Sequence, residues 1–268
     1  LLRFAVLLQG PGAPVPFGGD WLFYCGLATI ATGTLGVLGA QKLERLAGFL
    51  VIVSSGTLLA AFGFTGTTLT GPALFYLVSS VLGSGAFFML IEMTERNRAA
   101  AADLLAISFE AFGLQDKHDS EHPDEMVGVA IPAAMAFLGL AFISCALLLS
   151  GLPPLSGFAA KFALLSAALA APPEAPTLHA GLFVAALLLS GLAGLMSLSR
   201  LGVRVFWSAE RATPHLQWME AAPVAGLILL CVALSVGTGP ALSFFNATAR
   251  SLHHGPAYVD AVLPGATP

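Results

Sequence analysis

Long apolar runs separated by short polar links dominate this sequence. Most runs contain about twenty residues, the length that an α-helix needs to cross a hydrocarbon core roughly 30 Å thick. The runs do not alternate between apolar and polar residues at every second position, as the strands of a membrane barrel would. The pattern therefore predicts membrane-spanning helices at residues 21–40, 46–64, 73–93, 127–171, 180–199 and 222–243.

The run 127–171 is more than twice as long as one span requires. It contains the Pro153-Pro154 pair, so it is either two ordinary spans with a tight turn or one span broken into overlapping half-helices. Cytoplasmic loops of membrane proteins are enriched in Lys and Arg, and a single passage places seven basic residues on one side of the membrane. These residues are Lys42, Arg45, Arg96, Arg98, Arg200, Arg204 and Arg211. Two passages would move the last three to the other side, so the charges favour one broken passage.

Three further segments complete the predicted topology. Residues 1–9 look like the last turns of a helix whose beginning is missing, which suggests that the chain is a fragment. Residues 94–126 form an inside loop, in which apolar residues have the loosely helical spacing of a short helix on the membrane surface. Residues 244–268 form a C-terminal tail. We therefore predict one transmembrane domain over 1–268, with six passages and an N-terminal helix stub.

Composition agrees with an all-α integral membrane protein, folded as a polytopic helix bundle. Of the 268 residues, 57% are hydrophobic and only 10% are charged, whereas soluble domains contain about a quarter charged residues. The net charge of −4 does not favour nucleic-acid binding. The three cysteines lie singly in different runs and have no metal-ligand spacing, and the pair His118 and His122 lies in an acidic loop that contains a proline. No motif indicates a phosphate loop, a nucleophile with its base or a haem ligand pair. We expect no metal, no cofactor and no covalent catalysis.

Lys161 is the one basic residue that lies well inside a complete hydrophobic run. A charge at the middle of a bilayer costs about 2.5–3.5 kcal/mol on insertion scales, so such a residue is a candidate for function. It follows the helix break predicted at Pro153, Pro154 and Gly157, and discontinuous helices recur in transporters. Apolar surroundings disfavour a charged amine, which suits a lysine that exchanges protons. The alternative is a structural lysine that snorkels or pairs with an acid of a partner subunit.

A few other polar residues lie within the predicted spans. Glu92 is the only acid inside one of them. It is either an ion-pair partner of Arg96, four residues later, or a proton or cation port at the inner face. Ser54, Ser80 and Ser84 lie in the second and third spans. Their hydroxyl groups either support a chain of water molecules or allow close packing of the helices.

The motif Gly151-Leu-Pro-Pro-Leu-Ser-Gly-Phe-Ala-Ala-Lys161 resembles the signature of the D-type subunit of the multisubunit Mrp/Pha/Mnh-type monovalent cation/proton antiporters. These D-type subunits are relatives of the antiporter-like subunits of complex I. The segment 127–140, the Arg204-Val-Phe-Trp207 element and the tail 247–259 are similar to them as well. The resemblance therefore extends over essentially the whole chain.

This resemblance implies a fourteen-helix subunit of which the chain is the C-terminal part. It implies that Lys161 matches the lysine of the broken twelfth helix, which ends a central proton relay toward the outside. The other relay residues of the family, a glutamate and two lysines, would lie upstream of this chain. Ser54 and Ser80 stand where the family often has histidines, a departure that weakens any claim that these two positions themselves carry protons.

The resulting hypothesis is a proton-translocating subunit of a multisubunit Na⁺ or K⁺/H⁺ antiporter in a bacterial inner membrane. Such a subunit is a secondary transporter and not an enzyme. Its expected partners are the other antiporter subunits, the lipid bilayer, protons and Na⁺ or K⁺. One alternative is a proton-pumping subunit of complex I or of a membrane-bound hydrogenase. Another is a scaffold that conducts no ions and only docks partner subunits.

Overall fold

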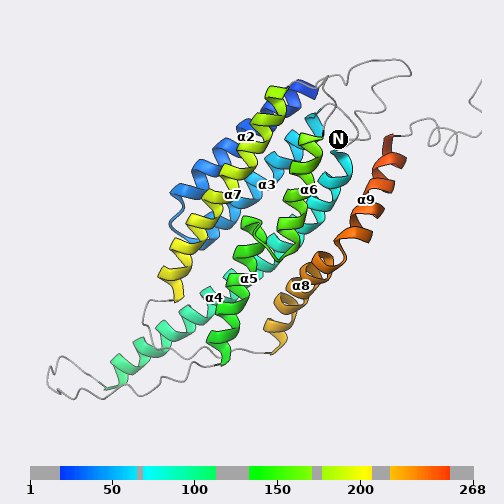
Figure 1. Cartoon of the computed structure of the whole chain (residues 1–268). Coiled ribbons are helices and arrows are strands. Elements are labelled where there is room, and N and C mark those ends of the chain that lie inside the picture. Colours follow the sequence, from blue (N-terminus) through cyan, green and yellow to red (C-terminus); the bar gives the residue numbers. More distant parts are fainter. Residues whose placement is uncertain (1–18, 65–68, 113–132, 171–176, 207–217, 254–268) are drawn as a thin grey trace, which may run out of the picture.

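The part of the chain that the computed structural model describes is a bundle of α-helices (Figure 1). It comprises residues 19–64, 69–112, 133–170, 177–206 and 218–253. The helices are α2 (Gly19–Gly39), α3 (Leu43–Gly63), α4 (Thr70–Phe112), α5 (Ala133–Ser150), α6 (Ser156–Leu169), α7 (Thr177–Phe206), α8 (Trp218–Val236) and α9 (Thr238–His253). No strand occurs in these residues. The predicted all-α helix bundle is confirmed.

Helices α2 and α3 form a closely packed antiparallel pair. Gly26 and Gly33 of α2, and Gly56 and Gly63 of α3, lie so near the partner helix that a Cβ atom at any of them would collide with it. Each pair of glycines is seven positions apart and therefore lies on one face of its helix. Small residues at such contacts let the backbones of membrane helices approach each other.

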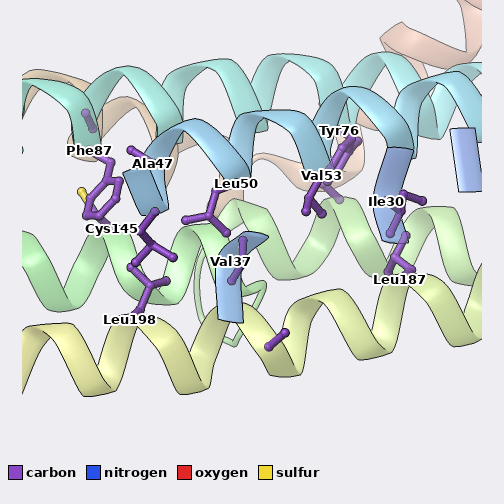
Figure 2. Packing of buried hydrophobic residues seen from close by; sticks show 14 of the residues in the cluster. Ile30, Val37, Ala47, Leu50, Val53, Tyr76, Phe87, Cys145, Leu187 and Leu198 are labelled. Atoms are coloured by element: carbon purple, nitrogen blue, oxygen red, sulfur yellow. The ribbon is translucent and has the colours of Figure 1, made fainter. Parts of the chain in front are cut away.

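A continuous apolar core joins these two helices to α4, α5 and α7. Figure 2 labels several of its members: Ile30, Val37, Ala47, Leu50, Val53, Tyr76, Phe87, Cys145, Leu187 and Leu198. Other apolar side chains of the same helices are exposed, including Leu35 and Leu188. Apolar residues both inside and outside the bundle are the distribution expected of helices surrounded by lipid.

The two ends of α7 lie beside the two ends of α2. At one end, Tyr24 Oη and His179 Nε2 are hydrogen-bonded at 2.9 Å. At the other, the Arg200 guanidinium donates to the carbonyl oxygens of Leu38 and Ala40, both at 2.9 Å. The two helices therefore run in the same direction. One broken passage between α4 and α7 requires this arrangement, because two complete passages would reverse α7.

Helices α5 and α6 form that broken passage. Figure 1 shows α6 continuing from the end of α5 toward the same end of the bundle, with the break about halfway along it. Both are shorter apolar helices, whereas four helical segments of the described residues are long and apolar enough to cross a membrane: Gly19–Gly39, Leu43–Gly63, Thr70–Arg96 and Leu178–Phe206. The bent pair α8 and α9 would make a fifth span. The predicted total of six passages stays a prediction.

Helices α4 and α9 extend beyond the limits predicted for their spans. Residues 94–112, where the sequence predicted an inside loop with a short surface helix, continue α4 into a helix of 43 residues. They contain neither Gly nor Pro, so the charges that mark the end of the apolar run do not end the helix. The predicted last span is bent by 84° at Gly237, and 244–253, placed in the tail, belong to α9. Other parts of the predicted stub, loop and tail lie outside the described residues, at 1–9, 113–126 and 254–268.

Candidate functional site

Helix α5 ends in a glycine cap. Gly151 has a φ angle of 79°, a left-handed conformation that glycine adopts readily. The N–H groups of Gly151 and of the next residue both donate to the carbonyl oxygen of Leu147 at 3.0 Å. Pro153 and Pro154 follow, and neither has an N–H group with which to continue the helix. Helix α6 begins two residues after Pro154.

Gly157 lets the two half-helices approach each other. A Cβ atom at this position would collide with the carbonyl oxygen of Leu148 in α5. A larger residue would therefore have to push α6 away from α5. The three residues that were predicted to break the helix, Pro153, Pro154 and Gly157, all lie at this junction.

Lys161 reaches back from α6 to the C-terminal end of α5. Its Nζ atom donates hydrogen bonds to the carbonyl oxygens of Leu149 at 3.1 Å and Ser150 at 2.8 Å. These carbonyls lack their helical donors because α5 stops, and the C-terminal end of a helix carries a partial negative charge that attracts a cation. A hydrogen bond with a charged donor contributes roughly 1.5–3 kcal/mol. The ammonium group thus supplies the hydrogen-bond donors that the last carbonyls of α5 lack.

Two glycines leave room for this side chain. A Cβ atom at Gly151 would press on the aliphatic part of Lys161, and one at Gly191 of α7 would lie 3.1 Å from the Ser150 carbonyl oxygen and 3.6 Å from Nζ. Both acceptors of Lys161 are uncharged backbone atoms, and no carboxylate of the described residues pairs with it. Among the described residues, backbone carbonyls and not an opposite charge therefore hold the lysine.

Side-chain hydroxyls hold both flanks of the break. Ser79 of α4 and Ser156, the first residue of α6, are buried and are hydrogen-bonded through their Oγ atoms at 3.0 Å. Ser235 of α8 donates to the carbonyl oxygen of Pro154 at 2.6 Å. Ser156 and Ser235 were not predicted as site residues. Serine is common in the apolar runs, and a single sequence does not say which helices meet.

The three serines predicted to line a hydrated path are bonded within their own helices. Ser54 donates to the Val51 carbonyl at 2.9 Å, Ser80 to the Leu77 carbonyl at 3.1 Å, and Ser84 to the Ser80 carbonyl at 2.5 Å. No hydrogen bond found among the described residues joins them to Lys161. Their part in proton transfer stays a prediction.

Glu92 forms an ion pair with Arg96, one turn later in α4. The Glu92 Oε1 and Arg96 guanidinium nitrogen are 3.7 Å apart, and both side chains are mostly exposed. Exposed pairs of this kind contribute up to about 1 kcal/mol. This ion pair agrees with the structural interpretation of Glu92 in the sequence analysis. A role of Glu92 as a proton or cation port at the inner face stays a prediction.

The described residues contain no group of three or more His, Cys, Asp or Glu side chains that could hold a metal ion. Cys25, Cys145 and Cys231 are free thiols in the same part of the chain. Cys145 and Cys231 are buried among apolar side chains.

Two curated proteins with similar sequences are named as antiporter subunits of the D type. The chain is 48% identical over 259 residues to the probable K(+)/H(+) antiporter D-type subunit of Rhizobium meliloti, which covers 94% of this chain and 48% of that protein. It is 27% identical over 241 residues to the Na(+)/H(+) antiporter D-type subunit of Bacillus subtilis, covering 88% and 43%. The chain spans about half the length of these relatives. No protein-family model matches the sequence.

Weaker similarity extends to a redox enzyme and to a solved complex. The chain is 28% identical over 176 residues to NADH-quinone oxidoreductase subunit N 2 of Sorangium cellulosum, covering 64% of this chain and 30% of that protein. Its fold is similar to a chain in the structure of the Mrp complex from Dietzia sp. DQ12-45-1b, with a TM-score of 0.65 and 21% identity, over 97% of this chain and 53% of that chain. At that identity the likeness shows a shared fold.

Proposed function

This chain is homologous to the D-type subunits of the monovalent cation/proton antiporters, and from this relationship we propose that it is a proton-translocating part of such an antiporter. Lys161 takes up and releases protons beside the break between α5 and α6. The complete protein works in a bacterial inner membrane with the other subunits of its complex. It acts as a secondary transporter that exchanges protons for a monovalent cation.

The observation that carries this proposal is the position of Lys161. Its partly buried amine lies against two carbonyl oxygens of a helix that stops beside it. Both the ammonium and the neutral amine can donate to these carbonyls, so the lysine can change its charge and keep its place. Hydrogen bonds from the ammonium are the stronger ones. None of the acidic side chains in the described part of the chain pairs with the lysine, so none of them fixes its charge.

The exchanged cation is proposed to be K⁺ or Na⁺. The relative with 48% identity is named for K⁺, whereas the relative with 27% identity is named for Na⁺. K⁺ is therefore the first cation to test, with Na⁺ as the parallel measurement.

A redox-driven proton pump is the second candidate, because the chain is also 28% identical to a subunit of an NADH-quinone oxidoreductase. The Rhizobium meliloti antiporter relative has the higher identity, 48%, and both antiporter relatives cover more of this chain than the oxidoreductase subunit does, which favours antiport. The two functions differ in what drives the proton, which is a cation gradient in one case and electron transfer in the other.

The test is cation-driven proton movement in inverted membrane vesicles that contain the full-length subunit with its partner subunits. In vesicles with the wild-type protein, adding K⁺ or Na⁺ should dissipate a preformed pH gradient. Lys161→Ala should assemble normally and lower the rate about 100-fold or more, the scale of a lost acid–base group. Lys42→Ala is the matched control, because Lys42 is an exposed lysine of the α2–α3 link.

Two results would contradict the proposal. Normal flux in Lys161→Ala would favour the scaffold, in which this lysine has a structural role only. Proton movement that needs an electron donor and ignores K⁺ and Na⁺ would favour the redox pump.

A further inference from the structure

Helix α8 contacts the break between α5 and α6. The hydroxyl of Ser235 donates to the carbonyl oxygen of Pro154 at 2.6 Å. One turn earlier in α8, Cys231 is buried in a small cluster with Leu148 of α5 and Leu155 of the break. Two successive turns of α8 therefore contact the break, one through apolar packing and one through a hydrogen bond.

The Pro154 carbonyl needs this donor because its helical donor is used elsewhere. In a continuous α-helix it would accept from the N–H group of Phe158. That N–H group donates instead to the carbonyl oxygen of Leu155 at 3.0 Å, in the first turn of α6. Pro154 is exposed at the surface of the bundle. In a membrane, lipid could not replace the Ser235 hydroxyl as a donor.

The two side chains hold opposite ends of the same short segment. Lys161 binds the carbonyls of Leu149 and Ser150, immediately before the break, whereas Ser235 binds the carbonyl of Pro154 near its end. Only Gly151 to Leu155 separate α5 from α6. Freeing the Pro154 end therefore loosens the peptide groups that place the acceptors of Lys161.

We propose that Ser235 is a positioning residue for Lys161, acting through the Pro154 carbonyl and the segment between α5 and α6. This inference rests on the proposed function of Lys161 as a proton-exchanging group. Ser235 lies in the last turn of α8, directly before the bend at Gly237. The end of α8 thereby sets the geometry at which the lysine meets its carbonyls.

The test compares Ser235→Ala with Ser235→Thr in the full-length subunit, assembled with its partners in vesicles. We expect Ser235→Ala to lower the maximal antiport rate roughly three- to tenfold, the scale of one lost hydrogen bond. The cation concentration that gives half the maximal rate should not change, since Ser235 does not contact the cation in this mechanism. Ser235→Thr keeps the hydroxyl and should restore most of the rate.

Ser243→Ala is the matched control. Ser243 is an exposed serine of α9 that donates to the carbonyl of Pro240 in its own helix at 2.8 Å, so its loss should leave the rate at the wild-type level. The amount of assembled complex is measured for each variant. If Ser235→Ala assembles poorly, Ser235→Cys replaces it, because the thiol has a similar size and is a weak donor.

Three outcomes would overturn the inference. The first is a wild-type antiport rate in Ser235→Ala, or in Ser235→Cys where that variant replaces it. The second is a lowered rate that Ser235→Thr does not restore. The third is a change in the half-saturating cation concentration with no change in the maximal rate. Failure of this inference is distinct from failure of the proposed function. Normal flux in Ser235→Ala together with lost flux in Lys161→Ala removes only the role of Ser235, whereas normal flux in Lys161→Ala removes the relay itself.

Discussion

Two helix breaks meet in this bundle and satisfy their free carbonyls with different chemistry. Five residues separate α5 from α6, and the amine of Lys161 reaches back to the carbonyls that the break exposes. Only Gly237 separates α8 from α9, which are bent by 84°. There the hydroxyl of Thr238 donates to two carbonyls in the last turn of α8, at 3.1 and 2.7 Å.

A helix break is therefore not by itself a sign of function. Every helix break in a membrane must find donors for its carbonyls, and a hydroxyl can do so as well as an ammonium. A threonine hydroxyl keeps its proton at physiological pH, whereas an amine can gain or lose one. The two breaks therefore differ in the donor that they use. The α5–α6 break has a titratable amine, whereas the α8–α9 break has a hydroxyl that does not titrate at physiological pH.

The largest expected effect is that of Lys161→Arg. Arginine keeps a positive charge and several donors for the α5 carbonyls, but it does not lose its proton in proteins. We expect normal assembly with antiport reduced about 100-fold or more, as for Lys161→Ala. Vesicle flux and the amount of complex are the measurements. Normal transport by the arginine variant would show that the break needs a charge and no proton exchange.

Gly157→Ala should disturb the first break sterically. A Cβ atom at this position collides with the carbonyl oxygen of Leu148, and overpacking of this kind costs about 1–3 kcal/mol of stability. Thermal unfolding of the purified complex measures the loss. The control is Gly139→Ala in α5, where a Cβ atom would have nothing within 4 Å. Equal stability of the two variants would contradict the close approach of α5 and α6.

Gly151→Ala tests the cap of α5 and the space beside Lys161. Any residue other than glycine is strained at a φ of 79°, at a cost of about 1–2 kcal/mol. The added methyl group also presses on the lysine side chain, so we expect antiport to fall together with stability. Gly239→Ala at the second break is the comparison. A Cβ atom at Gly239 would have nothing within 4 Å, and Gly239 has no positive φ. A harmless Gly151→Ala would exclude the glycine cap as a determinant of the site.

The smallest effect is expected at the second break. Thr238→Val removes the hydroxyl that satisfies two carbonyls of α8, which should cost about 0.5–1.5 kcal/mol of stability. The antiport rate should not change, because no proton-exchanging group is lost. Thermal unfolding and vesicle flux are again the two measurements. A loss of flux as large as that of the Lys161 variants would remove the distinction between the breaks.

Part of the site could be predicted because it depends on local chemistry. Pro153 and Pro154 cannot continue a helix, and the isolated charge of Lys161 is conspicuous in an apolar run. The single broken passage followed from the distribution of basic residues, and Arg200 beside the end of α2 agrees with it. The sequence separated the third span from a surface helix in the following loop, whereas α4 runs through both without a break, because charged residues mark the edge of an apolar run and do not end a helix.

The sequence by itself determined the all-α membrane bundle, the place of the break and the identity of its one charged group. Apolar run length, missing N–H groups and the cost of a buried charge are properties of a residue and its neighbours. Only the tertiary structure decided what Lys161 touches and which helix supports the break. Those contacts join α6 to the end of α5, and Ser235 to Pro154 across 81 positions of the chain. No local pattern specifies such pairs, because they follow from how the helices pack.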